Sequence, residues 1–500
     1  MESRRLASVA GVRESGGRRC AELFGAHLFS LGAAGGVRGF LRIRGGALGI
    51  VAAVAFLLGG CNAPKSNLAT FDGYLRSSNL EKCADFAGSK ISRSGRPTGE
   101  DLLWALQMGS VERLRQNYEE STEYFDRSEE MLNYYDYQNE AVDSFASTLV
   151  NENIVPYVGE EYDGVMVNTY KALNFMMVGN DELARVEFNR ALDRQRRAKE
   201  HFAREIEKVR SEVEAEQGKG DVKRSVENPE VRNLISQRYP GLYQFEAYPD
   251  FVNPFATYLA GVYFDMVGDY SKAVDLLKAA YGMVPENPYM AEDLAVTEKI
   301  LDGQGQLKNT VWVIFENGLG PVKEEFRIDL PLFVATDKVK YVGIALPRLV
   351  FREGAYPHLT VQAGGRSYDT RVVAEMDRVV QTEFNKDFGA ILTRAIISAA
   401  GKAAAQYALQ KQDDDKGGAI LSIAMAVYSL ATTAADVRIW TTLPKDFQVA
   451  RLSIPADRLI KVGGPGGAPF EVKIPDCKNA IVYVRIPLRQ GPQVYDVIRY

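Results

Sequence analysis

The spacing of apolar residues in this 500-residue chain changes near Lys308. That change limits the folds that the chain can adopt. Over residues 80–303, apolar side chains recur every three or four positions, which is typical of amphipathic helices. From residue 308 onward they alternate, as in the run at 311–315, which is typical of β-strands. The sequence therefore predicts an α+β protein, with an α-helical domain at 80–303 and an antiparallel, sandwich-like β domain at 308–500.

Six strands are expected in the second domain, each bounded by turn-forming residues. They lie at 311–315, 341–346, 358–363, 447–454, 470–474 and 481–487. Asn317-Gly318 follows the first strand and is typical of a tight hairpin turn. Between the third and fourth strands, residues 370–440 show a helical pattern, so we expect a long helical insertion in the β domain.

The insertion is poor in charge. Residues 389–409 carry only Arg394 and Lys402 as charged groups, and residues 417–435 carry none. Small residues allow helices to approach closely, so the pattern favours an apolar helical hairpin at 389–435 packed within the domain. An oligomer or partner interface is one alternative. Membrane insertion is another, because the uncharged stretch would span roughly 28 Å as a helix, which is a borderline length.

Three segments of the helical region, at 253–288, 168–192 and 102–131, share a pattern of small, large and turn residues. Small residues let two helices approach, large residues fill the gap between them, and a glycine-containing turn joins them. The positions expected to pack the two clearest units are Ala172, Phe175, Gly179, Ala184, Phe188, Gly261, Phe264, Gly268, Ala273, Leu277, Ala280 and Pro285.

These units resemble the tetratricopeptide repeat. The resemblance implies pairs of packed helices that present grooves to peptides or partner helices. However, the equivalent turn positions at 116, 179 and 268 are 63 and 89 residues apart, whereas the family repeats every 34 residues or so. We therefore expect a compact, irregular helical array in place of a regular superhelix.

Residues 1–60 have the features of a leader that is removed from the mature protein. An apolar run at 47–58 is preceded by arginines and followed by small residues, which is typical of a secretory signal. The run is too short for a membrane-spanning helix, which needs about 20 residues. Its end at Gly60-Cys61 resembles a bacterial lipobox, which implies cleavage between these residues and acyl chains on Cys61. Residues 61–79 are then expected to form a lipidated polar tether.

Asn62 follows the expected lipidation site. In the best-studied sorting rule an aspartate at this position retains a lipoprotein in the inner membrane, so the resemblance implies the bacterial outer membrane, with the chain facing the periplasm. The whole arrangement resembles an uncharacterised family of bacterial lipoproteins with tetratricopeptide-like repeats followed by a C-terminal β domain. This resemblance implies a location and an architecture, but no activity.

The cysteines bear on the same question. Cys20 belongs to the leader and Cys61 would carry the lipid, which leaves Cys83 and Cys477. Secretion implies an oxidising compartment, in which these two could form a disulfide. The alternative is two unrelated thiols, because a sequence does not show the distance between them.

No pattern in the chain is typical of an enzyme. Only three histidines are present, and no two histidines or cysteines have metal-ligand spacing. Phosphate-binding loops and nucleophile elbows are also absent from the sequence, so no cofactor or metal is expected. The alternative of a periplasmic hydrolase in the β domain would use His358, Asp369 and Asp436, which lack nucleophile–base spacing.

The net charge of the mature chain and its expected location indicate which kinds of partner it binds. Without the leader, 52 Lys and Arg face 62 Asp and Glu, a net charge of −10 that does not suit nucleic acid. The membrane, through the acyl chains on Cys61, and other envelope proteins are the expected partners. We therefore expect a non-enzymatic protein-interaction scaffold, with a structural subunit of an envelope complex as the alternative.

Overall fold

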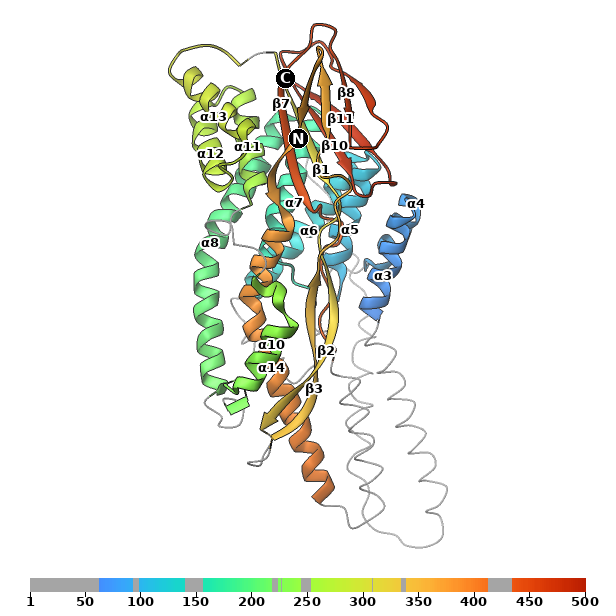
Figure 1. Cartoon of the computed structure of the whole chain (residues 1–500), viewed down its shortest axis with the longest axis vertical. Helices are drawn as coiled ribbons and strands as arrows, with labels where there is room; N and C mark the ends of the chain where they lie inside the picture. Colours follow the sequence, from blue (N-terminus) through green and yellow to red (C-terminus); the bar gives the residue numbers. More distant parts are fainter. Residues whose placement is uncertain are drawn as a thin grey trace, which may run out of the picture. The chain divides into compact units, whose positions relative to one another are not determined.

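The computed structural model describes residues 63–92, 99–139, 156–217, 224–225, 227–243, 253–307, 309–333, 339–411 and 434–500. Helices come first along the chain and strands follow, so the fold class is α+β (Figure 1). Leu57–Tyr500 form one compact unit, and one hydrophobic core runs from Leu68 in the helical part to Ile498 near the C-terminus. The two segments predicted as separate domains are therefore parts of the same compact unit.

Most of the helical part consists of consecutive helices packed in pairs. The pairs are α5 (Asp101–Leu114) with α6 (Tyr118–Asn139), α7 (Glu161–Met177) with α8 (Asp181–Gln217), and α11 (Pro254–Met266) with α12 (Tyr270–Met283). Between the second and third pairs lie α10 (Pro229–Arg238) and the 3₁₀ helix η3 (Pro240–Tyr243), and α13 (Pro288–Leu301) follows α12.

An Asn-Pro dipeptide starts three of these helices. Asn228, Asn253 and Asn287 each cap a helix, because the side chain accepts a hydrogen bond from a backbone N–H of the first turn. The proline that follows has no N–H to leave unsatisfied and already has a helical φ. At the turns inside the second and third pairs, Gly179 and Gly268 have φ angles of +75° and +82°, which favour glycine.

Residues 63–90 form two helices, α3 (Ala63–Arg76) and α4 (Leu80–Lys90), so the prediction of a polar tether at 61–79 is wrong over most of its length. The apolar side chains Leu68, Phe71 and Leu75 have helical spacing and are buried. Phe71 packs edge-on against Trp104 of α5, with ring centroids 5.8 Å apart. This stripe is short and lies among polar residues, which is why composition suggested a tether.

The strands of the described residues form three sheets. In chain order they are β1 (Thr310–Asn317), β2 (Val322–Phe333), β3 (Val339–Val350), β4 (Thr360–Ala363), β5 (Arg366–Asp369), β6 (Arg371–Glu375), β7 (Asp446–Ser453), β8 (Leu459–Gly463), β9 (Phe470–Lys473), β10 (Asn479–Ile486) and β11 (Val494–Arg499). The five-stranded sheet has the order β11-β10-β1-β7-β6, the four-stranded sheet has the order β5-β4-β8-β9, and β2 and β3 form a two-stranded ribbon.

β1 is the central strand and is buried on both faces. Val311, Val313 and Phe315 belong to a core that also contains Val361 and Val462 of the four-stranded sheet, so the two sheets form a sandwich. The alternate side chains of β1, such as Trp312, belong to the core shared with the helices. β1 is antiparallel to β7 but parallel to β10, so the sandwich is mixed and the prediction of a purely antiparallel domain is wrong.

The expected hairpin at Asn317-Gly318 is also wrong. β1 has β7 and β10 as neighbours and does not pair with β2, the next strand along the chain. The Asn317 side chain instead joins three segments, because its amide nitrogen donates to Tyr356 O and Asp446 Oδ2, both at 2.9 Å, and its oxygen accepts from Ala355 N.

The predicted insertion begins later than expected. β5 and β6 occupy most of residues 366–375, and α14 (Met376–Lys411) follows them. Residues 412–433, which include most of the second half of the predicted hairpin, lie outside the described residues, so the hairpin is not shown. Residues 434–440 are not helical, although Val437, Ile439 and Trp440 are buried. No helix among the described residues has both the length and the apolar character needed to cross a membrane.

Candidate functional site

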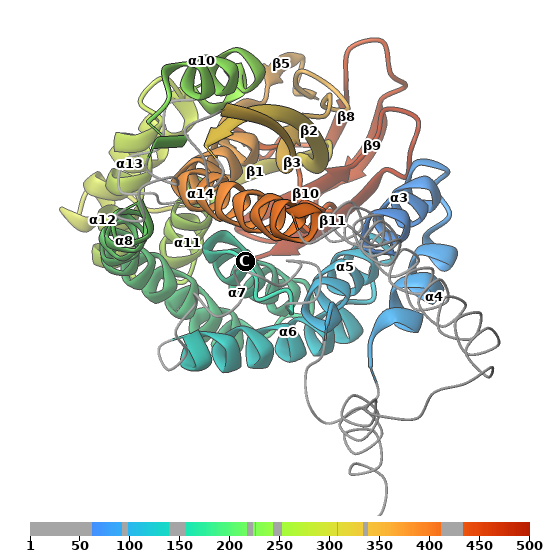
Figure 2. The ribbon, with the colours of Figure 1, turned by 90° about the horizontal axis from the view of Figure 1, so that it is seen from below.

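The first helix of each pair lies between its partner helix and the strands. Figure 2 shows α5, α7 and α11 nearer to the strands than α6, α8 and α12. All of α5 and nearly all of α11 is buried. The rings of Phe255 on α11 and Phe447 on β7 are stacked with centroids 3.6 Å apart, and Gln107 on α5 donates to Thr441 Oγ1 at 3.0 Å. The inner face of the helical array is therefore covered by the chain itself and is not open to a partner.

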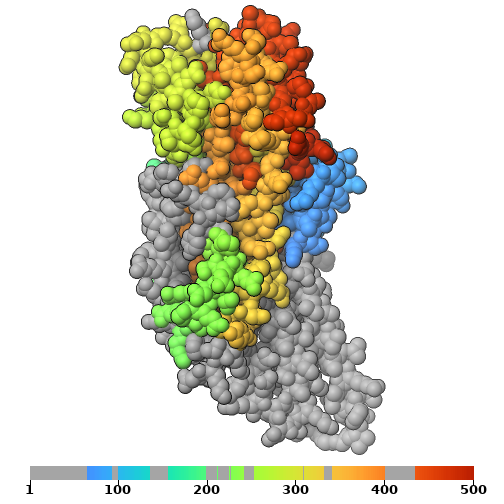
Figure 3. All heavy atoms as spheres, in the orientation of Figure 1, coloured from blue at the N-terminus to red at the C-terminus, as the bar shows by residue number. Residues whose placement is uncertain are grey.

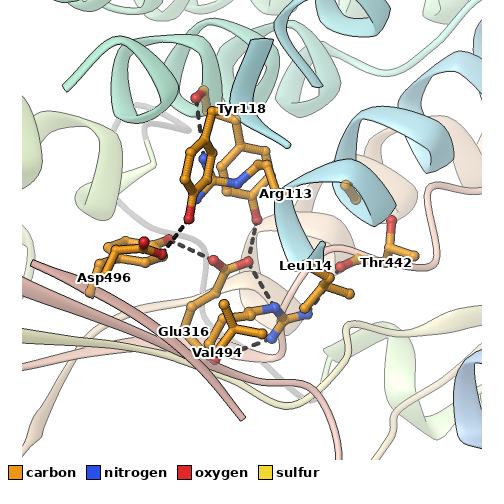
Figure 4. A pocket seen from close by; sticks show the side chains of 11 residues that line it. Arg113, Leu114, Tyr118, Glu316, Thr442, Val494 and Asp496 are labelled. Atoms are coloured by element: carbon orange, nitrogen blue, oxygen red, sulfur yellow. Dashed lines mark hydrogen bonds and ion pairs between the residues drawn. The ribbon is translucent and has the colours of Figure 1, made fainter. Parts of the chain in front are cut away.

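A buried carboxylate, Glu316, lies where this array meets the sheet (Figure 4). It is on the helix-facing side of β1, on the same face as Trp312 and Ile314 and two residues beyond Ile314. Tyr170 on α7 donates to one carboxylate oxygen at 2.7 Å, and Tyr483 on β10 donates to the other at 2.6 Å. Arg485 Nε lies 3.1 Å from the first oxygen. We call Glu316, Tyr170, Tyr483 and Arg485 the polar junction.

Arg113 on α5 lies beside the polar junction. Its guanidinium is 4.6 Å from the ring centroid of Tyr170 and 5.5 Å from that of Tyr483, and Nη1 donates to Asn174 Oδ1 at 2.5 Å. Burial lowers the pKa of Arg113, but Tyr483 and the charge of Glu316 raise the pKa by more, so the side chain stays cationic. Burial, followed by the charge of Glu316, raises the pKa of Tyr170 and Tyr483 well above 10, so both hydroxyls remain donors.

The space beside the polar junction is small. Its volume for water is about 20 Å³, room for about one molecule. At its edge, Tyr118 and Gln116 donate hydrogen bonds to Asp496. The charged groups here are held by one another, and no nucleophile is positioned next to a base among them. The polar junction therefore joins the sheet to the helices, and nothing in its geometry indicates catalysis.

A larger groove lies between α6 and α8, on the solvent-facing side of the helical array, and encloses about 740 Å³. Its two walls differ in charge. The α6 wall carries Asp126, Glu129 and Glu130, and the α8 wall is mainly basic, with Arg190, Arg194 and Arg197 beside Asp193. We call this hollow the charged groove.

A buried lysine holds the walls of the charged groove together from beneath. The Nζ atom of Lys171, on α7, lies 2.7 Å from Asp126, 2.7 Å from Glu129 and 3.0 Å from Glu187 of α8. Burial lowers the pKa of Lys171, but the hydrogen bonds that it donates to Asp126 and Glu129 raise the pKa more, so the lysine remains charged. The groove therefore has a fixed base. The charged groove could not be predicted from the sequence, because its acids and the lysine are spread over three helices.

Most of the residues predicted to pack the repeats are buried, and two glycines of the helical array lie at close helix contacts. A Cβ atom placed on Gly261 would be 2.9 Å from the side chain of Leu277, and one placed on Gly109 would be 2.4 Å from Phe125. Of the other predicted positions, Ala172, Ala184, Phe188, Phe264, Ala273, Leu277 and Ala280 are buried, Phe175 is partly buried, Gly179 and Gly268 form turns, and Pro285 is exposed just after α12.

The cysteine predictions have different outcomes. Gly60 and Cys61 lie outside the described residues. Cys83, buried in α4, and Cys477, partly buried between β9 and β10, are both free thiols, so the predicted disulfide is not formed in this structure. Burial, together with the nearby charge of Asp72, raises the pKa of Cys83 to about 12.

The groups considered for a hydrolase are only partly brought together. His358 Nε2 lies 3.7 Å from Asp369, whereas Asp436 is paired with Arg438 at 2.7 Å. Among the described residues, no group of three or more His, Cys, Asp or Glu is arranged to hold a metal ion.

A pair of buried acids makes stability depend on pH. Burial, then the charge of Asp293, raises the pKa of Asp265 to about 7. The folded state therefore binds a proton that the unfolded state has released above about pH 4. This contribution to stability is complete below pH 4 and is lost as the pH rises to about 7.

Asp265→Asn, which stays neutral, is therefore expected to have the melting temperature of the wild type near pH 4 and a higher one at pH 8. Melting curves at intervals of one pH unit measure the difference. The exposed Asp275→Asn on α12 is the control. A difference between Asp265→Asn and wild type that does not change with pH would contradict this account.

Comparisons with known proteins add little to this picture. No protein-family model matches the chain, and no curated protein matches it either. Among solved structures, a chain titled "MamA MSR-1 C2" is similar, with 12% identity over 48% of this chain and 88% of that chain, at a TM-score of 0.25. At that TM-score the likeness carries no argument about fold or function.

Proposed function

We propose that this protein is a non-enzymatic interaction scaffold of the bacterial envelope, anchored by acyl chains on Cys61 to the outer membrane, and that a partner protein binds in the charged groove. The observation that supports the groove as the binding site is its position. The inner face of the array is covered by the chain's own strands, whereas the groove between α6 and α8 is open and has walls of opposite charge.

Ion pairs within the groove are easily exchanged for a partner's charges. Arg197 is half exposed, and its Nε lies 3.0 Å from Asp193, which is equally exposed. Such surface pairs contribute only about 0–1 kcal/mol, so replacing them costs little. The buried Lys171 and its acids stay in place and keep the walls at a fixed separation. This combination suits a protein partner that carries both charges and binds in a salt-dependent manner.

Arg197→Glu is expected to reduce recovery of the partner at least tenfold, because it places an acid in the basic wall. The measurement is quantitative mass spectrometry of cross-linked envelopes, solubilised in mild detergent and purified through the full-length chain. Lys461→Glu is the matched control, since Lys461 is also half exposed and is paired with Glu471 at 3.1 Å outside the groove. Equal recovery with both variants would refute the groove as the binding site.

Cys61→Ser is expected to remove the mature chain from the membrane fraction, or to leave the precursor uncut, because serine has no thiol to take the lipid. Fractionation and intact mass measure both outcomes. Cys477→Ser is the control, because it also removes a free thiol but should leave processing unchanged. Normal cleavage and membrane fractionation of Cys61→Ser would end the lipid-anchor proposal.

A further inference from the structure

A second pocket lies where α10 and η3, the β2–β3 ribbon and α14 meet. In Figure 3 the green atoms of α10 lie against the yellow atoms of the ribbon. The pocket has a volume of about 390 Å³, within the range of about 300–1,000 Å³ that is usual for small-molecule sites. It takes no part in the polar junction or the charged groove.

The walls of this pocket are aromatic. Tyr239 follows α10, Phe326 is on β2, Phe351 follows β3, and Phe384 is on α14. Tyr239 and Phe326 meet edge to face, with ring centroids 5.8 Å apart at 84°. Tyr239 also packs against Phe388 of α14, at 4.8 Å. Because these rings are supported from different elements, the pocket has a defined shape and favours a planar aromatic guest.

Two arginines line the same pocket. The Arg348 guanidinium lies 4.7 Å from the ring centroid of Phe326, and Arg238 comes from the last turn of α10. The carboxylate paired with Arg348, that of Glu324, is 3.8 Å away, and both side chains are about half exposed. This pair is too long for a hydrogen bond, so Arg348 is able to bind an incoming carboxylate.

Tyr239 supplies a further polar group. The residue is 3% exposed, and its hydroxyl has no hydrogen-bond partner among the described residues. A buried polar group without a partner costs about 1–3 kcal/mol, and its proton is retained because burial raises the pKa of this tyrosine. The hydroxyl is closed to solvent in the free protein, so a ligand that brings an acceptor oxygen would remove this cost only if the ring turned toward the pocket.

We propose that this pocket binds a small aromatic carboxylate, with its ring against the aromatic wall formed by Tyr239, Phe326 and Phe384 and its carboxylate at Arg348. Aromatic rings on several sides select the ring, and Arg348, whose paired acid is too far away for a hydrogen bond, selects the negative charge. Neither property depends on the partner proposed for the charged groove.

The test is calorimetric titration of the purified full chain with 2-naphthoate, and with the neutral 2-naphthamide as the matched ligand. We expect 2-naphthoate to bind at least tenfold more tightly than the amide. Arg348→Met, which keeps an unbranched side chain but removes the guanidinium, should abolish that preference. Arg327→Met is the control, because Arg327 is on the same ribbon but does not line the pocket.

Tyr239→Phe gives an independent reading. Removing the unpaired hydroxyl should leave the free protein at least as stable as the wild type, while 2-naphthoate binds more weakly. No binding of 2-naphthoate at millimolar concentration, or equal affinity for the acid and the amide, would overturn the proposal. So would unchanged affinity in Arg348→Met.

Discussion

Glu316→Ala is expected to lower the free energy of unfolding by about 3–5 kcal/mol, the loss typical of removing one partner from a buried ion pair. Glu316 is 3% exposed, and its two oxygens take hydrogen bonds from Tyr170 and Tyr483 and the ion pair with Arg485. Without the carboxylate, the Arg485 cation loses its ion pair and two buried hydroxyls lose their acceptor. The substitution therefore weakens the contacts of β1 with both β10 and α7.

Urea denaturation measures this loss. Glu324→Ala on β2 is the control, since its side chain is half exposed and its ion pair with Arg348 is long, so a change within about 0.5 kcal/mol is expected. A loss below 1 kcal/mol in Glu316→Ala would show that the polar junction does not hold the sheet to the helices.

Gly261→Leu is expected to cost about 1–3 kcal/mol or more, because it overpacks the contact between α11 and α12. Even a Cβ atom at this position would lie 2.9 Å from Leu277 Cγ and 3.3 Å from the backbone nitrogen of Leu277. The side chain of Leu277 can turn away, but the backbone nitrogen cannot, so the two helices must separate.

Gly282→Leu is the matched control, since Gly282 is also helical but has no atom within 4 Å of a Cβ placed there. Replacing an exposed helical glycine should stabilise the protein slightly. Equal melting temperatures for wild type and Gly261→Leu would mean that the helices do not touch at this glycine.

The sequence predicted well those elements whose pattern is local. β1, β7 and β10 are long apolar strands, and each was expected within two residues of its observed bounds. β2 and β3 form a two-stranded ribbon, and only β3 was expected, because β2 carries several charged residues, such as Glu324, Glu325 and Arg327, that conceal its alternation. The short strands β5 and β6 were masked by the helical pattern that follows them.

The sites were much harder to predict. The polar junction joins positions 170, 316, 483 and 485, and nothing in a sequence shows that such distant residues meet. One signal was available: Glu316 directly follows five apolar residues of its strand, and a charge there needs a partner. The prediction of the repeats was limited in a similar way. Their spacing and small residues predicted paired helices, but not that the strands would cover the inner face.

That covered inner face also governs the order in which the molecule can assemble. β1 is hydrogen-bonded to β7 and β10, which follow it by well over a hundred residues, and the inner helices are buried against this sheet. A chain synthesised from its N-terminus therefore completes its helices long before the surface that buries them exists. Pairing of such distant segments is slow, because the loop entropy is lost before the contacts form. During that interval the apolar sides of α5, α7 and α11 face water and need protection from aggregation.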